Sequence, residues 1–303
     1  MTEEPVRGTA ALQDSWALLQ AAGEQAAVPT AGAVLIRDGT NILYRLTDGV
    51  VARIGLPGSH RAVERQIQAS RWLDRVGVPV VRLVENIAQP TLVEGRPVTW
   101  WVELPAHRHA TPAELGSALR RLHNLEPPDA PSLPAADPFE GLRSSIDGGV
   151  VLSDEDRGWL KELVEHLRLD YREFVSNLPP TVIHGDAWQG NVVVPAAGGD
   201  PVLLDLDHLG IGPREWDLVS LAVDYTDFAR ISESDYDAFV TAYGGYDMTT
   251  LAGYRTLATI RELRWTLFVA GKADSSGRAA EQAQHRLACL KGEVARPWTW
   301  SAF

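Results

Sequence analysis

The chain has 303 residues, a formal net charge of −12 at pH 7 and a pI of about 5.1. A net negative charge disfavours nucleic acid or an anionic membrane surface as a partner, because a protein that binds such a surface needs Lys and Arg in excess. A single cysteine, Cys289, excludes an internal disulfide and a cysteine-based zinc site. With no apolar run near the roughly 18 residues of a membrane span and no signal-peptide pattern, we expect a cytoplasmic protein that does not enter membranes.

The first third of the chain predicts an antiparallel sheet with helices. Residues 9–27 are rich in alanine and carry leucines at helical spacing, and residues 61–75 form a second helical pattern. Short apolar runs between turn residues predict strands at 33–37, 41–46, 50–54, 80–83, 89–94 and 98–102.

The remainder is mainly helical. Thr111-Pro112-Ala113-Glu114 has the pattern of a capping box with proline at the first helical position. Ser153 and the three acids that follow it predict the start of a long helix. Further helices are expected at 213–228, 232–243, 251–272 and 275–291.

The stretch between His184 and Asp207 carries the chemistry. Two apolar runs separated by a turn-rich segment predict a β-hairpin. Asn191 immediately precedes the first strand and Asp205 follows the second, so antiparallel pairing would bring them together at the open end of the hairpin. Asp186 would lie on the loop beside them.

Two carboxylates and one amide oxygen suit a hard divalent cation such as Mg²⁺, and one of the carboxylates can serve as a base. Kinases use an Asp to orient and deprotonate the attacking hydroxyl, an Asn for one metal ion and a later Asp for the metal on the nucleotide phosphates. The alternative is a surface hairpin whose Asp and Asn merely cap the loop.

The order of three motifs resembles that of the aminoglycoside phosphotransferase superfamily, kinases of small molecules with a protein-kinase-like fold. The motifs are His184-Gly185-Asp186-x-x-x-x-Asn191, Leu204-Asp205-x-Asp207 and Gly210-x-Gly212-Pro213-x-x-x-Asp217-Leu218. The resemblance implies an α+β fold with two lobes. An N-terminal lobe, 1–104, would cover the nucleotide with its antiparallel sheet and helix, and a mainly helical C-terminal lobe, 105–303, would carry the catalytic hairpin and the acceptor pocket.

Carried over by position, the resemblance implies ATP and Mg²⁺ as cofactors, Asp186 as the catalytic base, and Asn191 and Asp205 as metal ligands. Asp217 would be a structural acid that holds the catalytic loop. His184 would be a buried residue that orients it.

The resemblance also implies a nucleotide site. Arg53 stands where the family has the Lys or Arg that contacts phosphate, and Glu64 matches the helix acid that pairs with that cation. The backbone from Trp101 to Glu103 would face the adenine. The alternative for Arg53 and Glu64 is two solvated charges that never meet.

The acceptor pocket is expected in the helices that follow the second metal ligand. Asp224 and Glu262 would pair with a substrate ammonium group, and Trp188 and Trp265 would stack on a sugar ring. The chain is also similar to actinobacterial glucosamine kinases of this superfamily, so the favoured acceptor is a cationic amino sugar, glucosamine, phosphorylated at its 6-hydroxyl.

Three alternatives stay open. The acceptor could be an aminoglycoside or another hydroxylated antibiotic. The chain could instead be a nucleotide-binding regulatory protein that has lost catalysis. The pocket candidates could be helix-surface acids and core tryptophans.

Overall fold

In a computed structural model, residues 7–175, 178–273 and 277–301 are described, with the backbone alone for residues 7–13. The chain divides into two compact units that alternate along the sequence. Unit 1 is Met1–His109 with Pro128–Leu133 and Val193–Asp207, and unit 2 is Ala110–Pro127, Pro134–Val192 and His208–Phe303. The predicted boundary at 104/105 stays a prediction. The structure groups the second half of the hairpin region with unit 1.

Unit 1 is built on an antiparallel sheet of five strands in the order β1-β2-β3-β5-β4. A smaller sheet has the order β6-β8-β9 and contains the predicted hairpin. The elements are α1 (Arg7–Ala26), β1 (Val34–Asp38), β2 (Ile42–Arg45), β3 (Val50–Ile54), α2 (His60–Arg75), β4 (Thr91–Val93), β5 (Arg96–Val102), β6 (His107–His109), β8 (Val192–Pro195, its first residue in unit 2) and β9 (Val202–Leu203).

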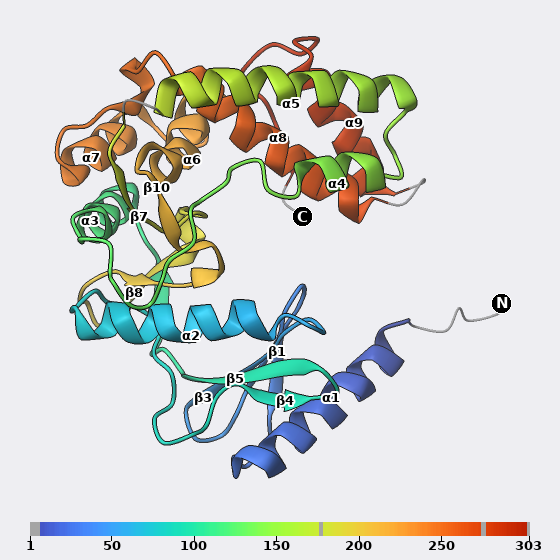
Figure 1. The fold of residues 1–303 in the computed structure, drawn as a ribbon, viewed down its shortest axis with the longest axis vertical. Coiled ribbons are helices and arrows are strands. Elements are labelled where there is room, and N and C mark those ends of the chain that lie inside the picture. Colours follow the sequence, from blue (N-terminus) through green and yellow to red (C-terminus); the bar gives the residue numbers. More distant parts are fainter. Residues whose placement is uncertain (1–6, 176–177, 274–276, 302–303) are drawn as a thin grey trace. The chain divides into compact units, whose positions relative to one another are not determined.

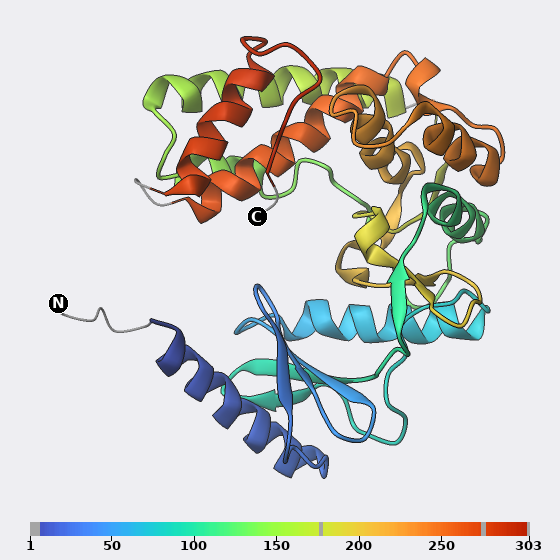
Figure 2. The ribbon, with the colours of Figure 1, turned by 180° about the vertical axis from the view of Figure 1, so that it is seen from behind.

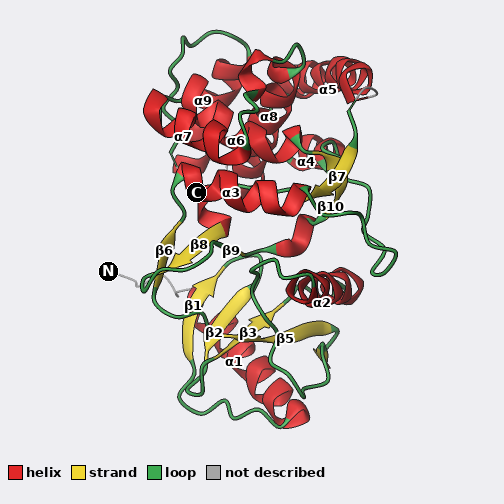
Figure 3. Cartoon of the chain, turned by 90° about the vertical axis from the view of Figure 1, so that its left-hand side faces the viewer, coloured by secondary structure: helices red, strands yellow, loops and turns green. Residues whose placement is uncertain are grey.

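The two helices of unit 1 cover opposite faces of the large sheet (Figure 3). Successive side chains of a strand point to opposite faces, so Trp100 packs with Leu19 of α1 and Trp101 packs with Ile67 of α2. This arrangement buries both tryptophans. The core of the unit therefore has two layers, with β3 and β5 in the middle.

The predicted strand 80–83 is wrong. Val80 forms an isolated parallel bridge to Leu203, and Leu83 forms an isolated antiparallel bridge to Trp101. Because the two residues pair with different partners in opposite senses, no continuous ladder can form between them. The predicted strand 89–94 is shorter in the structure and spans only the three residues of β4.

Unit 2 is mainly helical. Helix α3 packs against α7, and α8 packs against α9 (Figures 1 and 2). Its elements are α3 (Pro112–His123), α4 (Leu142–Gly148), α5 (Asp154–Val175), β7 (Pro180–Ile183), β10 (Gly210–Pro213), α6 (Glu215–Thr226), α7 (Glu233–Tyr243), α8 (Tyr254–Lys272), α9 (Arg278–Leu290) and the short 3₁₀ helices η1 (Gln189–Asn191), η2 (Leu206–His208) and η3 (Met248–Thr250).

The start of α3 confirms the predicted capping box. Thr111 Oγ1 accepts from the backbone N–H of Glu114 at 3.3 Å, and the Glu114 carboxylate accepts from the backbone N–H of Thr111 at 2.8 Å. Two of the backbone donors at this helix end are thereby satisfied. The predicted helix 275–291 begins outside the described residues, and α9 accounts for the rest of it.

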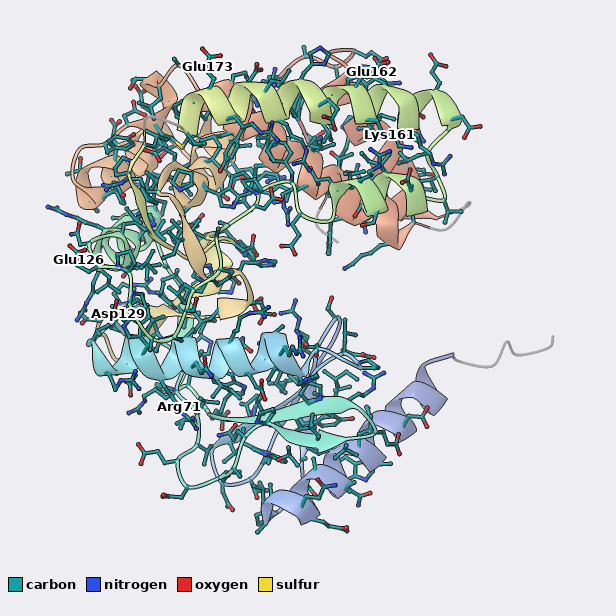
Figure 4. The ribbon with its side chains drawn as sticks, viewed as in Figure 1. Arg71, Glu126, Asp129, Lys161, Glu162 and Glu173 are labelled. Carbon is teal, nitrogen blue, oxygen red and sulfur yellow. The ribbon has the colours of Figure 1, made fainter. Side chains whose placement is uncertain are left out.

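Helix α4 was not predicted, because its seven residues are too few to show a helical pattern. It is tied to α5 by an ion pair between Lys161 Nζ and Asp147 Oδ1 at 2.6 Å. Figure 4 shows Lys161 on the α4 side of α5, with Glu162 on its outer side. The two neighbours on α5 thus face a partner helix and solvent respectively.

Helix α8 is the central helix of unit 2, with contacts to α4, α5, α6 and α9. Even its charged residues Arg261 and Glu262 are buried. A charge in such a helix needs an opposite charge beside it. None of the helices in the described ranges has the length and apolar character that crossing a membrane requires.

Candidate active site

The catalytic loop starts at the end of β7, with His184, Gly185 and Asp186. Gly185 has φ +83°, and a Cβ at this position would lie 2.3 Å from the carbonyl oxygen of His208. Only glycine combines this left-handed conformation with such a close approach. Pairing of β7 with β10, which sets Gly210 opposite Ile183, brings the two segments together.

Helix α6 holds the backbone of this loop. The buried carboxylate of Asp217 accepts from the N–H groups of His184 at 2.6 Å and Gly185 at 2.8 Å. Trp216 Nε1 donates to the carbonyl of Gly185 at 3.0 Å. Two adjacent residues of α6 thus fix both the N–H and the carbonyl of Gly185, which confirms Asp217 as the acid that holds the loop.

His123 of α3 completes this anchor. Its Nε2 lies 3.0 Å from Asp217 Oδ2, and its Nδ1 lies 2.8 Å from the hydroxyl of Tyr243. Burial alone would raise the pKa of Asp217, but the hydrogen bond from His123 and the charges and backbone donors around it hold that pKa below its ordinary value. His123 is thus a packed, hydrogen-bonded residue.

Asp186 and Asn191 lie together. Asn191 Nδ2 donates to the carbonyl oxygen of Asp186 at 2.9 Å and contacts its Oδ2 at 3.3 Å. Both contacts are made by Nδ2, so neither of them uses the Oδ1 acceptor of the Asn191 amide. The Asp186 side chain is 42% exposed, so a substrate can reach it.

The sequence interpretation missed the residue that contacts the other oxygen of Asp186. Arg261 Nη1 lies 3.3 Å from Asp186 Oδ1, although only 3% of the Arg261 side chain is exposed. Burial lowers the pKa of Arg261 to about 10, and the charge of Asp186 acts in the opposite direction. Arg261 stands next to the predicted substrate residue Glu262, and no pattern in this segment distinguishes the roles of the two.

Arg53 in unit 1 is held by acids, but not by the predicted one. Its Nη2 lies 2.5 Å from Asp207 Oδ2 and 3.8 Å from Asp205 Oδ1. Glu64 is exposed and makes no ion pair with Arg53 within the described residues. The predicted Arg53–Glu64 pair is therefore wrong.

Helical spacing explains this difference. The buried face of α2 is centred on Gln66, Ser70 and Leu73, and at 100° per residue Glu64 lies on the opposite side of the helix. The apolar pattern of α2 could have revealed this. Asp205 itself adopts a left-handed backbone with φ +49°, a conformation that Asp tolerates better than most residues.

Two of the backbone donors predicted to face adenine are already used within unit 1. The N–H of Val102 donates to the carbonyl of Arg82 at 2.8 Å, and that of Glu103 donates to Gly49 at 2.7 Å. The Glu103 carboxylate pairs with Arg45 Nε at 3.2 Å. The Trp101 side chain is buried, and its Nε1 donates to Thr99 Oγ1 at 2.8 Å.

The predicted amine-binding acids of unit 2 have partners within the protein. Asp224 pairs with Arg230 at 2.7 Å, and burial raises its pKa. Glu262 pairs with Arg255 at 2.6 Å. Burial, together with a hydrogen bond to the neighbouring acid Asp227, raises the pKa of Glu262 to about 9.

The two predicted aromatic residues lie in different surroundings. Trp188 is 48% exposed and lies two residues after Asp186. Trp265 is partly buried and lies 6.1 Å from the Phe228 ring, in a tilted arrangement. Of this pair, Trp188 is the more exposed, and stacking on a sugar requires an accessible ring.

The donor set fits the group that phosphoryl transfer uses. The described residues contain no cluster of three or more His, Cys, Asp or Glu side chains that could hold a metal ion by themselves. Mg²⁺ commonly takes one or two protein oxygens and completes its shell with waters and substrate phosphates. Within unit 2, Asn191 and Asp186 lie together and supply oxygens of that kind.

A model of the phosphotransferase enzyme family matches residues 35–258. An aminoglycoside 3'-phosphotransferase of Streptomyces fradiae is 30% identical over 207 residues, covering 61% of this chain and 75% of that protein.

Solved structures of similar fold include an aminoglycoside phosphotransferase from Streptomyces rimosus in complex with ADP and streptomycin. Its TM-score is 0.63 at 20% identity, with 84% of this chain and 98% of that chain covered. Another is an amicoumacin kinase in complex with AMP-PNP, Ca²⁺ and Ami, with a TM-score of 0.68 at 14% identity, covering 93% and 96%. These likenesses confirm the predicted protein-kinase-like fold.

Proposed function

Because the chain belongs to the phosphotransferase enzyme family, we propose that it transfers the γ-phosphoryl group of ATP to a hydroxyl of a small amino sugar. The observation that carries this proposal is the loop at Asp186. An accessible carboxylate contacts the amide of Asn191, on a backbone fixed from behind by Asp217 and Trp216.

In the proposed reaction, the Asp186 carboxylate accepts the proton of the acceptor hydroxyl. The hydroxyl oxygen forms a bond to the γ-phosphorus while the bond from that phosphorus to the bridging oxygen of ATP breaks. ADP leaves with the electron pair, and the products are a phosphate ester, ADP and the proton on Asp186. Holding the base in place is the main contribution of the protein, because such reactions depend on positioning and charge stabilisation.

Asn191 and Asp205 are the proposed ligands for Mg²⁺, and Arg53 the proposed cation for the nucleotide phosphates. When bound, Mg²⁺ would neutralise charge on the phosphates during transfer. Arginine can bind phosphate through two parallel hydrogen bonds, which suits the position of Arg53. The ADP and AMP-PNP in the similar structures support an adenine nucleotide as donor.

Trp101 and Glu103 stay proposed contributors to the adenine site through backbone groups of residues 101–103 other than the N–H groups of Val102 and Glu103. The carbonyl groups of this segment are the remaining candidates, since the Glu103 donor is used by Gly49. Glu64, whose predicted pair with Arg53 does not form, is not part of the proposed nucleotide site.

For the acceptor, the proposal of an amino sugar rests on the acidic chain and on Trp188. Asp224 and Glu262 would have to exchange their arginine partners for a substrate ammonium group, which disfavours them as its binders. Asp137 and Glu140 are better candidates. Both are exposed, and both act electrostatically on Arg264, which also feels the charge of Asp186. Trp265 stays a proposed but less accessible stacking residue.

The second candidate acceptor is an aminoglycoside. The relative from Streptomyces fradiae favours it, because that protein is an aminoglycoside 3'-phosphotransferase. Both candidates are polyhydroxylated amines and would use the same base and the same acidic surroundings. They differ in size, so turnover of each distinguishes them.

The test is a coupled assay of ADP release with ATP and Mg²⁺. The acceptor panel contains glucosamine, glucose, N-acetylglucosamine, choline, homoserine and kanamycin. Asp186→Asn is the blank, because it keeps the shape of the side chain and removes the base.

Turnover of glucosamine that disappears in Asp186→Asn is the expected result. Turnover of kanamycin alone would move the assignment to the aminoglycoside while leaving the role of Asp186 intact. Nucleotide binding without turnover of any acceptor would contradict the proposed kinase and favour a regulatory nucleotide-binding protein.

A further inference from the structure

Arg261 is the side chain whose position the proposed reaction does not yet explain. It comes from the central helix α8, and its guanidinium lies over the ring of Trp216 with Cζ 4.0 Å from the ring centroid. Nη2 donates to the carbonyl of Trp216 at 3.0 Å, and Nη1 contacts Asp186 at 3.3 Å. Within the described residues, Nε is buried without a hydrogen-bond partner.

Burying a cation in this way is costly unless an anion compensates for it. Asp186 is the acid that forms an ion pair with Arg261 in the described structure. Even a fully buried ion pair adds little net stability compared with apolar residues of the same size, and here only the cation is buried, so stability alone is a weak reason for this arrangement. The geometry at the Asp186 carboxylate gives a stronger one.

The two carboxylate oxygens of Asp186 have different neighbours. Oδ1 lies against Arg261 and Oδ2 against Asn191. The rigid stack on Trp216 fixes Arg261, and Trp216 also anchors the carbonyl of Gly185. One tryptophan therefore links the backbone of the catalytic loop to the group that contacts its carboxylate.

We propose that Arg261 is a positioning residue that holds the Asp186 carboxylate in the orientation needed to accept the hydroxyl proton. This inference rests on the proposed function, because it assigns Asp186 as the base. Arg261 acts through Asp186 and does not contact the substrates. Its planar guanidinium both stacks on Trp216 and donates to Asp186, which a lysine cannot reproduce fully.

The alternative is that Arg261 only helps to pack α8 against α6. Arg286 on α9 provides a matched control, because it is another buried arginine stacked on a tryptophan. Its Cζ lies 4.8 Å from the centroid of Trp300, and it donates to the carbonyl of Trp265 at 2.8 Å. Burial lowers the pKa of each arginine to about 10.

The experiment measures kcat and KM for Arg261→Met, Arg261→Lys and Arg286→Met with the acceptor that the wild type phosphorylates. In Arg261→Met we expect kcat to fall about 100-fold, the usual effect of a misplaced catalytic group, with KM for ATP and acceptor unchanged. Arg261→Lys should recover part of the loss. Arg286→Met should keep wild-type kcat, even if its melting temperature falls as much as that of Arg261→Met.

Wild-type kcat in Arg261→Met, or an equal loss of kcat in Arg286→Met, would overturn the proposal. Where Arg261→Met does not fold, Arg261→Lys decides. A reduced kcat at unchanged KM supports positioning, and wild-type kcat overturns it.

A thermal double-mutant cycle tests the contact without any turnover. Asp186→Asn should lower the melting temperature in the wild-type background, because it leaves the buried cation without its carboxylate, and should change it little in Arg261→Met. Equal shifts in both backgrounds would overturn the contact. Failure of the wild type to phosphorylate any acceptor would defeat the proposed function, a result that these thermal shifts distinguish from failure of the contact.

Discussion

At the scale of single residues, the cation of β3 is bound by two acids from one short segment. Arg53 contacts both Asp205 and Asp207, and 12% of its side chain is exposed. Asp205 is also the proposed metal ligand. In this chain, the residue that orients Arg53 therefore comes from the segment after the hairpin, and α2 leaves its Glu64 in solvent.

This arrangement gives a residue-scale prediction. Asp207→Asn should raise KM for ATP about fivefold, as expected for loss of a partly exposed ion pair worth about 1 kcal/mol, because Arg53 loses the carboxylate that orients it. Glu64→Gln serves as the control and should leave KM unchanged. Steady-state kinetics at saturating acceptor would measure both, and the reverse ranking would restore the helix acid as the partner of Arg53.

At the scale of elements, α8 buries two neighbouring charged residues that have different partners. Arg261 points to the loop at Asp186, while its neighbour Glu262 joins Arg255 and Asp227 on another side of the helix. Both side chains are buried. The charge of Arg261 is therefore balanced by the loop, and that of Glu262 is set by Arg255 and Asp227.

Glu262 makes the stability of the protein depend on pH. Its pKa is raised from 4.5 to about 9 by burial and by the neighbouring Asp227. Between these values the folded state retains a proton that the unfolded state releases, so stability falls as pH rises through this window. We expect the melting temperature of the wild type to decline from about pH 6 to about pH 9, and that of Glu262→Gln to decline less.

A suitable control is Glu165→Gln, which alters an exposed glutamate of α5. It should keep the wild-type slope in a thermal shift series across the same buffers. Parallel slopes for the wild type and Glu262→Gln would contradict the assignment of the titrating group to Glu262.

Elements with a strong local pattern were predictable, and those defined by distant partners were not. The capping residues of α3 and the hairpin runs of β8 and β9 follow from local spacing. Strand β10 is Gly-Ile-Gly-Pro and exists because it pairs with β7, which no local pattern reveals. In the site, the acids of the loop could be predicted from their motif. Which of Arg261 and Glu262 contacts the loop could not, because this depends on which side of α8 faces it.

At the scale of the whole molecule, the two units are interleaved along the chain. The hairpin segment belongs to unit 1, since β8 pairs with β6 and Leu203 bridges to Val80. The sequence predicted a single boundary at 104/105, because local patterns along a sequence do not show which distant segments pair. Contacts between segments as far apart in the sequence as β6 and β8, or Val80 and Leu203, are invisible to that reasoning.

The net charge of −12 supplies the prediction at this scale. An acidic field attracts a cationic acceptor, and salt weakens this attraction as the Debye length shrinks from about 30 Å at 0.01 M to about 8 Å at 0.15 M. KM for kanamycin or glucosamine should therefore rise over this range. A neutral sugar that is turned over provides the control, and salt-independent KM values for the amines would show that the field plays no part.

Trp188 gives the protein a built-in optical probe. All ten tryptophans lie in the described residues, and Trp188 is the one whose side chain is exposed. Its indole lies against Gly190, just after the loop at Asp186. A collisional quencher such as iodide would act mainly on the emission of this ring, so occupancy of the loop could be followed by fluorescence, without a label and without turnover.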